Sequence, residues 1–211
     1  MLNRRRKNYF HFIGYTSAIA LSVLMPLSVQ AVPQSGNVLN RLLPQEQATL
    51  KAGNAVVTGE NGHYVGRILI TAPVSITWNV LTDYDHFKNF LPGVISSQIL
   101  ETQGNRTVFE QVNQVKVLLF TQKSRLVITA VQQYPQEISF QLKQGEIKSL
   151  KGLWKLEPVA PNQVLVTQDV TFDPGNSISR GLAFTIYKNA LVDSLNAIKQ
   201  EVGRRVTNSK T

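Results

Sequence analysis

Between residues 94 and 173 the sequence alternates short apolar segments with turn residues, and this spacing constrains the fold more than any other feature. Gly104-Asn105, Tyr134-Pro135, Gly145 and Pro161-Asn162 are typical turn positions. They separate six segments of strand-like composition: residues 94–102, 107–120, 124–132, 137–143, 150–157 and 164–172. Connections this short leave no room for crossover helices, so the strands must pair antiparallel.

The flanking segments complete the predicted fold. Residues 64–71 form a further strand, and residues 73–81 and 86–91 form two short helices, the second stopped by Pro92. Residues 177–206 form one long helix, because their apolar positions recur at steps of three and four. The sequence therefore predicts an α+β fold, in which a curved antiparallel sheet of about seven strands wraps around a long C-terminal helix.

A cavity is expected between this helix and the sheet. A helix is about 10–12 Å across with its side chains, which is narrower than a curled sheet of about seven strands. The helix carries two neighbouring apolar rows, one of Leu182, Ile186 and Leu195, the other of Tyr187, Leu191, Ile198 and Val202. A stripe this wide can pack on the sheet with one edge and line a cavity with the other.

The first 31 residues follow the pattern of a secretory signal. Residues 4–7 are basic, residues 12–27 are uncharged and mainly apolar, and Val29 and Ala31 are small residues suited to a signal peptidase. An uncleaved membrane anchor is the alternative, since the apolar run approaches the ~20 residues that a span needs. We expect cleavage near Ala31 and export to a periplasm or lumen.

The chain is thus expected to comprise a signal peptide (1–31), a tether with a short helix (32–53), a ligand-binding domain (54–207) and a disordered tail (208–211). Cleavage removes four of the 22 basic residues and none of the 13 acidic ones, which leaves a net charge of +5. A domain this mildly basic, without a recognisable nucleic-acid motif, is not expected to bind nucleic acid.

Cysteine is absent from the sequence and histidine occurs only three times. The lack of cysteine excludes disulfides, thiolate metal sites and cysteine nucleophiles. No His/Glu spacing typical of a metal site occurs either, so neither a metal nor a cofactor is expected.

Several short stretches resemble one known superfamily. They are Gly-Arg-Ile-Leu-Ile-Thr-Ala-Pro at 66–73, Trp-Asn-Val-Leu-Thr-Asp-Tyr at 78–84, Phe-Lys-Asn-Phe-Leu-Pro at 87–92 and Gly-Leu-Trp at 152–154. Together with the long C-terminal helix, they make residues 56–206 resemble the START-like superfamily of polyketide cyclases/dehydrases, coenzyme Q-binding proteins and lipid-transfer domains. The resemblance implies a helix-grip fold whose cavity accepts a lipid, quinone or polyketide. The secretion signal departs from cytoplasmic and mitochondrial members, so their partners are not carried over.

Aromatic residues at inward strand positions and on the helices are the candidate ligand-binding residues. The predicted set is Trp78, Tyr84, Phe87, Phe90, Leu91, Phe140, Trp154, Gln168, Tyr187 and Leu191, of which Tyr84, Gln168 and Tyr187 offer polar groups. The alternative is that these side chains form ordinary core. Residues 87–92 are expected to form the cavity opening, because a short segment flanked by loops opens at the least cost.

Asp83, Asp85 and His86 are the main candidates for acid–base chemistry, with His86 as a general base oriented by a carboxylate. Aspartate is also a favoured helix cap, and neighbouring turn residues need not face one pocket. We predict capping by Asp83 or Asp85, an exposed His86 and no catalytic residue. His63 follows the Asn61-Gly62 turn signal and is also expected to be exposed.

Basic residues gather around the Gly145 turn and on the neighbouring strands: Lys143, Lys148, Lys151 and Lys155, with Lys116, Lys123 and Arg125. One interpretation is a contact with an anionic membrane surface. The interpretation we favour is a solvated sheet face whose lysines prevent pairing between sheet edges.

Three functions are compatible with these features. We favour an exported binding protein that holds a hydrophobic small molecule, such as a lipid, quinone, isoprenoid or pigment. The second is a polyketide cyclase or dehydratase, which would need a titratable group inside the cavity. The third is an interaction domain with a vestigial cavity. The sequence carries no signal for the oligomeric state.

Overall fold

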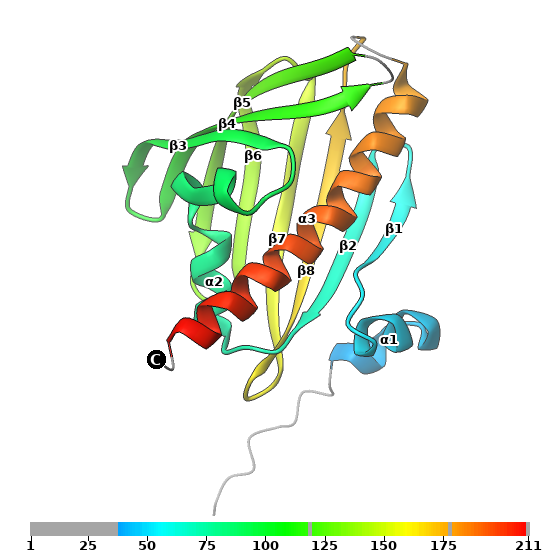
Figure 1. The fold of residues 1–211 in the computed structure, drawn as a ribbon, viewed down its shortest axis with the longest axis vertical. Coiled ribbons are helices and arrows are strands. Elements are labelled where there is room, and N and C mark those ends of the chain that lie inside the picture. The colour runs from blue at the N-terminus through cyan, green and yellow to red at the C-terminus, as the bar shows by residue number, and fades with distance from the viewer. Residues whose placement is uncertain (1–37, 118–119, 177–178, 210–211) are drawn as a thin grey trace, which may run out of the picture. The chain divides into compact units, whose positions relative to one another are not determined.

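The strands predicted from the turn spacing form one antiparallel sheet beside a long helix (Figure 1). The computed structural model describes residues 38–117, 120–176 and 179–209. The strands are β1 (Val56–Glu60), β2 (His63–Ile70), β3 (Val94–Gln103), β4 (Arg106–Val117), β5 (Phe120–Gln133), β6 (Glu137–Gly145), β7 (Ser149–Ala160) and β8 (Gln163–Asp173). The helices are η1 (Val38–Arg41), α1 (Pro44–Lys51), α2 (Val74–Leu81), η2 (Tyr84–Asn89) and α3 (Arg180–Asn208). The strand order is β1-β2-β8-β7-β6-β5-β4-β3.

The sheet has eight strands rather than about seven, because β1 precedes the first predicted strand. Asn61 and Gly62 have φ angles of 54° and 89° and join β1 to β2 in a tight hairpin. The sequence does not predict β1, because its second half, Thr58-Gly59-Glu60, is polar, exposed and contains a glycine.

The turn between β4 and β5 also differs from the prediction. The sequence places Phe120 at the end of one strand, whereas β4 ends at Val117 and Phe120 begins β5. Residues 115–120 contain no Gly, Pro, Asn or Asp that would indicate a turn there. Residues 118–119 lie outside the described part of the chain.

α3 begins at Arg180, where the Ser179 hydroxyl accepts a hydrogen bond from the Leu182 N–H at 3.4 Å and caps the helix. Residues 177–178, included in the predicted helix, lie outside the described residues. At its other end α3 includes Asn208, which the sequence assigns to the tail.

α3 packs closely on β2 because β2 presents a glycine at the contact. A Cβ built on Gly66 would lie 2.8 Å from Leu195 Cδ1 and 3.3 Å from Leu191, closer than a real side chain approaches without movement. Leu195 and Val202 are fully buried and join Ile68 in the main core. This contact fixes one side of α3 against the sheet.

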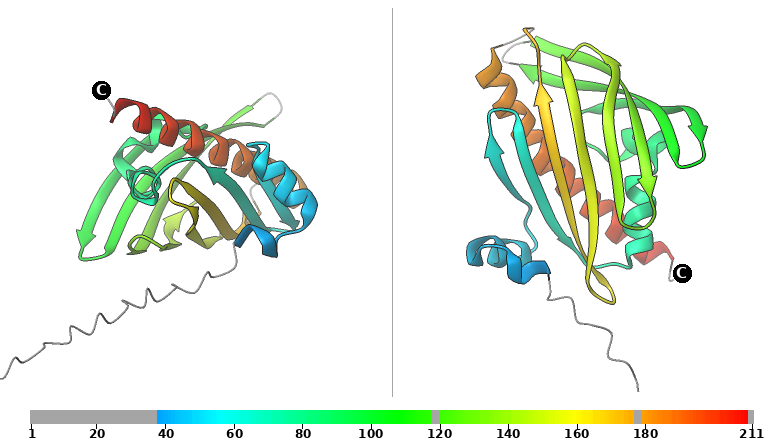
Figure 2. Two further views of the ribbon diagram at one scale, coloured as in Figure 1. Left: turned by 90° about the horizontal axis from the view of Figure 1, so that it is seen from below. Right: turned by 180° about the vertical axis from the view of Figure 1, so that it is seen from behind.

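The N-terminal helices η1 and α1 lie at one end of the sheet beside β1 and β2, and they pack on a small part of its outer face (Figure 2). Leu69 and Leu165 face away from α3, because consecutive residues of a strand alternate between faces. They pack with Leu39 of η1 and Leu50 of α1 in a second, smaller core. α3 lies on the opposite, inner face, where it contacts β2.

An ion-pair network joins the C-terminal half of α3 to the segment between α2 and η2. Arg205 donates hydrogen bonds to Asp83 at 2.6 Å and to Glu201 at 2.7 Å, and Arg204 pairs with the same Glu201 carboxylate. Asp83 also lies 2.6 Å from His86 Nδ1.

Asp83, one of the two predicted caps, occupies the N-cap position of η2, but the expected capping hydrogen bond is absent. The Asp83 side chain makes no capping hydrogen bond to η2, because its carboxylate is held by Arg205 and His86. Asp85 instead accepts a hydrogen bond from the Ile99 N–H at 2.6 Å, which ties η2 to β3.

The network lowers the pKa of both carboxyls. Partial burial of Asp83 opposes its ionisation, but the hydrogen bonds and charges of His86 and Arg205 outweigh this effect and lower its pKa. Hydrogen bonding to Arg204 lowers the pKa of Glu201 despite some desolvation, and Arg205 adds to the effect. A carboxyl whose pKa is lower in the folded than in the unfolded state stabilises the native protein while it is ionised. For Asp83 and Glu201 this stabilisation is fully present above their ordinary pKa values of 3.8 and 4.5, and it is lost as pH falls toward the lower folded-state values.

We expect Arg205→Gln to destabilise the protein by about 1–3 kcal/mol near neutral pH, because it leaves Asp83 and Glu201 without their shared partner. Arg204→Gln is the matched control and should cost much less than Arg205→Gln, since this side chain is 60% exposed and pairs only within α3. Urea unfolding at several pH values measures both. Equal effects of the two substitutions near neutral pH, or an Arg205 effect that does not decrease as pH falls below 3.8, would contradict this assignment.

Candidate functional site

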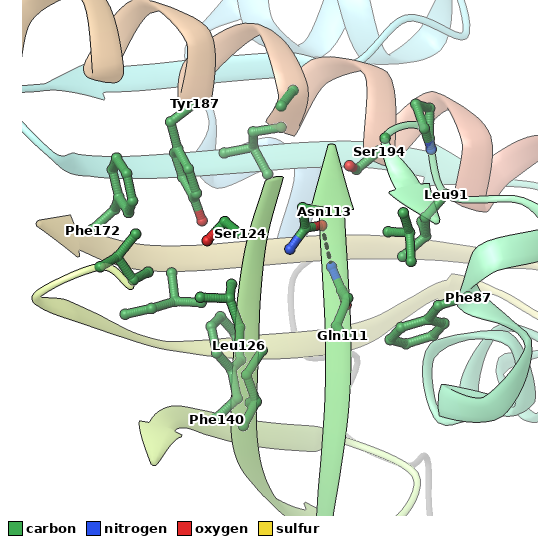
Figure 3. Close-up of a pocket in the computed structure, with 18 of the residues that line it drawn as sticks. Phe87, Leu91, Gln111, Asn113, Ser124, Leu126, Phe140, Phe172, Tyr187 and Ser194 are labelled. Carbon is green, nitrogen blue, oxygen red and sulfur yellow. Dashed lines mark hydrogen bonds between the residues drawn. The ribbon is translucent and has the colours of Figure 1, made fainter. Parts of the chain in front are cut away.

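A cavity of about 350 Å³ lies between α3 and the inner face of the sheet (Figure 3). Its walls come from β4 to β8, from α3, from the end of α2, from η2 and from the segment that joins η2 to β3. Aliphatic and aromatic side chains predominate, including Phe109, Leu126, Ile128, Ile138 and Ile198. The cavity that the width of the sheet predicts is therefore present.

Eight of the ten predicted ligand-binding residues line this cavity: Tyr84, Phe87, Leu91, Phe140, Trp154, Gln168, Tyr187 and Leu191. Trp78 and Phe90 do not. Trp78 is buried on the α2 side, where its ring meets Tyr134 edge-on at 5.2 Å. Phe90 packs edge-on against Phe87 at 5.7 Å and lies beside the Arg205 network.

Two aromatic groups make up much of the wall. Tyr84 stacks on Phe109 with 4.3 Å between ring centroids, and Phe87 meets both rings edge-on. Phe172 and Tyr187 stack at 4.3 Å, and in Figure 3 the Tyr187 ring extends from α3 into the cavity.

The Gly-Leu-Trp stretch in β7 has a steric role in this wall. Gly152 pairs with Phe140 across β6 and β7, and a Cβ at Gly152 would lie 2.6 Å from Phe140 Cζ. The absence of a side chain at Gly152 thus leaves room for the Phe140 ring in the wall. Trp154, two residues further along β7, faces the same cavity.

The sequence prediction omits a polar group in the wall, formed by Gln111 and Asn113 of β4, Ser124 of β5 and Ser194 of α3 (Figure 3). Gln111 Nε2 donates to Asn113 Oδ1 at 2.7 Å, and Ser124 is the cross-strand partner of Asn113. The signal was available, because residues 109, 111 and 113 alternate onto one face and Phe109 marks that face as inward.

Few titratable groups line the cavity. Among the described residues they are Tyr84, Tyr187 and Glu146. Burial raises the pKa of Tyr84 to about 12, although a hydrogen bond from Gln132 opposes the shift, and burial raises the pKa of Tyr187 further still. Both phenols are therefore neutral near pH 7. The Glu146 carboxylate accepts hydrogen bonds from the Arg125 N–H and the Ser124 hydroxyl.

The three predicted polar groups differ in whether they are free to form a hydrogen bond with a ligand. The Tyr84 hydroxyl already accepts a hydrogen bond from Gln132 Nε2 at 3.3 Å. The Gln168 amide and the Tyr187 hydroxyl line the cavity, and neither has a hydrogen-bond partner among the described residues. These two groups are free to bind a ligand.

The remaining candidates lie outside the cavity wall. His86 and His63 have side chains that are 59% exposed, and each pairs with an aspartate, Asp83 and Asp169 respectively. Lys148 pairs with Asp173 and Lys155 with Glu157, while Lys143 and Lys151 are exposed. In the described part of the chain no cluster of His, Asp and Glu could hold a metal ion, and no helix is long and apolar enough to cross a membrane.

Comparison with known proteins identifies the class. Residues 70–199 match the family described as polyketide cyclase / dehydrase and lipid transport. The chain belongs to this family, which includes both enzymes and lipid-binding proteins. The ribosome association toxin RatA of Pseudomonas aeruginosa is 25% identical over 138 residues, which cover 63% of this chain and 91% of the toxin.

Solved structures share the fold. An aromatase/cyclase from a Streptomyces species superposes with a TM-score of 0.57 at 18% identity, covering 68% of this chain and 94% of the enzyme. A STAR-related lipid transfer protein from Xanthomonas axonopodis gives a TM-score of 0.57 at 20% identity, covering 70% and 92% of the two chains. At such identities the likeness extends to the helix-grip fold alone.

Filling the cavity from α3 should abolish ligand binding. Ser194→Phe places a large ring in the cavity and should lower the affinity for apolar ligands at least tenfold, with a stability change of about 1–3 kcal/mol. Asn189→Phe is the control, because Asn189 lies on the same helix but is exposed. Titration calorimetry with one apolar ligand compares the two variants. Unchanged affinity in Ser194→Phe would show that ligands bind elsewhere.

Proposed function

We propose that this protein binds and carries a hydrophobic small molecule in the cavity between α3 and the sheet. The observation that supports the proposal most directly is the lining, in which aromatic and aliphatic side chains predominate and only neutral polar groups and Glu146 interrupt them. An apolar ligand transferred from water into such a cavity gains about 25 cal/mol for each Å² of apolar surface that it buries.

Catalysis is the alternative that the family keeps open, because its members include cyclases and dehydrases. Cyclisation or dehydration needs a group that takes up or releases a proton near pH 7. Within the described wall the two tyrosines have pKa values too high for this task, and Glu146 is held by hydrogen bonds at the rim. We therefore favour binding without turnover.

Ligand binding can be followed with the two tryptophans, since Trp154 lines the cavity and Trp78 does not. In Trp78→Phe an apolar ligand should shift the emission of the remaining Trp154, and in Trp154→Phe the emission of Trp78 should stay unchanged. At a free ligand concentration about a hundredfold above Kd, the melting temperature should rise by about 5–10 °C.

The same titration separates the alternatives. A library of lipids, quinones and isoprenoids that produced neither a Trp154 response nor a rise in melting temperature would contradict the proposal. Chemical conversion of a bound ligand, abolished by Glu146→Gln or Tyr187→Phe, would establish an enzyme instead.

We also propose that the domain acts outside the cytoplasm. The proposal rests on the basic and apolar pattern of residues 4–31, which lie outside the described part of the chain. Cell fractionation with mass spectrometry of the mature N-terminus should give a soluble product that begins near Val32. An intact N-terminus, or recovery only with detergent, would favour the membrane-anchored alternative.

A further inference from the structure

The cavity becomes more polar toward its opening. The solvent-exposed part of its rim contains Pro92, Gly93, Gln122 and Glu146. Along β5 the inward residues change from exposed Gln122 through half-buried Ser124 to the buried Leu126, Ile128 and Ala130. Along β5 the deep end is therefore apolar, and Gln111, Asn113, Ser124 and Ser194 form a polar belt below the rim. Gln168, the cross-strand partner of Trp154, is a further polar group outside this belt.

The belt contains both hydrogen-bond donors and hydrogen-bond acceptors that have no partner among the described residues. The bond from Gln111 to Asn113 occupies the Asn113 carbonyl and leaves the Asn113 amide N–H groups and the Gln111 carbonyl without partners among the described residues. Ser194 contributes a further hydroxyl from α3. At the deep end, by contrast, Tyr84 and Thr107 both accept hydrogen bonds from Gln132.

The charge at this level of the cavity is negative. The Ser124 hydroxyl, opposite Asn113 across the strand pair, donates to the Glu146 carboxylate at 3.4 Å. No Lys, Arg or His side chain is among the described lining residues. An ionised carboxylate or phosphate in the belt would thus meet no cation, would approach Glu146, and could use only the donors of the belt.

We propose that the cavity selects amphiphiles with an uncharged hydrogen-bonding head, such as a hydroxyl, carbonyl or amide, and rejects the corresponding anions. The head lies at Gln111, Asn113 and Ser124, and the apolar tail lies toward Ile128 and Phe109. This inference rests on the proposed binding function and adds the class of ligand.

Dodecanol, dodecanoate and dodecylamine test the inference, because they share one tail and differ in head charge. Each is titrated at pH 7.5, below its solubility limit or critical micelle concentration, with Trp154 emission and melting temperature as readouts. Dodecanol should bind at least about tenfold more tightly than dodecanoate. Asn113→Lys should reverse this order, while Gln114→Lys, which adds the same charge on the outer face of β4, should preserve it.

Ser194→Lys repeats the reversal from the opposite wall, so the test does not depend on the folding of one variant. Dodecanoate bound as tightly as dodecanol would overturn the head-group inference and leave the binding function intact. Preferential binding of dodecylamine would also overturn it, because Glu146 would then select a cation. If none of the three ligands altered either readout, the binding function itself would be contradicted.

Discussion

The structure depends on one steric constraint, the coverage of an eight-stranded sheet by a single long helix. The contact is made on the β2 side, where Gly66 admits Leu191 and Leu195 of α3. On the side that faces β4 and β5, α3 presents the small residues Ala190 and Ser194, which cannot reach across to those strands. Close packing on one side and small side chains on the other leave the cavity open within a well-packed domain.

The sequence predicts the fold where local signals agree with long-range packing. The strands from β3 to β8 follow from turn residues and period-two alternation, both of which act over a few residues. The β4–β5 connection lacks such residues, so its position is determined by pairing along the strands. Asp83 differs again, since its partner Arg205 is 122 positions away and local preference for a helix cap does not outweigh that ion pair.

The candidate site was likewise predictable where local periodicity determines which way a side chain faces. Alternation in the strands placed Phe140 and Trp154 in the wall, and helical spacing placed Tyr187 and Leu191 there. The sequence predicts the helix that contains Trp78, but it does not show that the apolar face of this helix packs against Tyr134 and away from the cavity. The polar belt was less apparent, because Gln111 and Asn113 interrupt the apolar alternation that identifies an inward face.

Affinity and selectivity arise from different parts of this cavity. Each buried methylene contributes about 0.8 kcal/mol, so a tail in the apolar end supplies most of the binding free energy whatever the head group is. A hydrogen bond in the belt replaces one with water and contributes only about 0.5–1.5 kcal/mol, whereas an unpaired buried charge costs much more. A belt of Gln111, Asn113 and Ser124 beside Glu146 therefore adds little affinity for a neutral head and a large penalty for an anion. The apolar wall determines how tightly a ligand binds, and the polar belt determines which ligand it is.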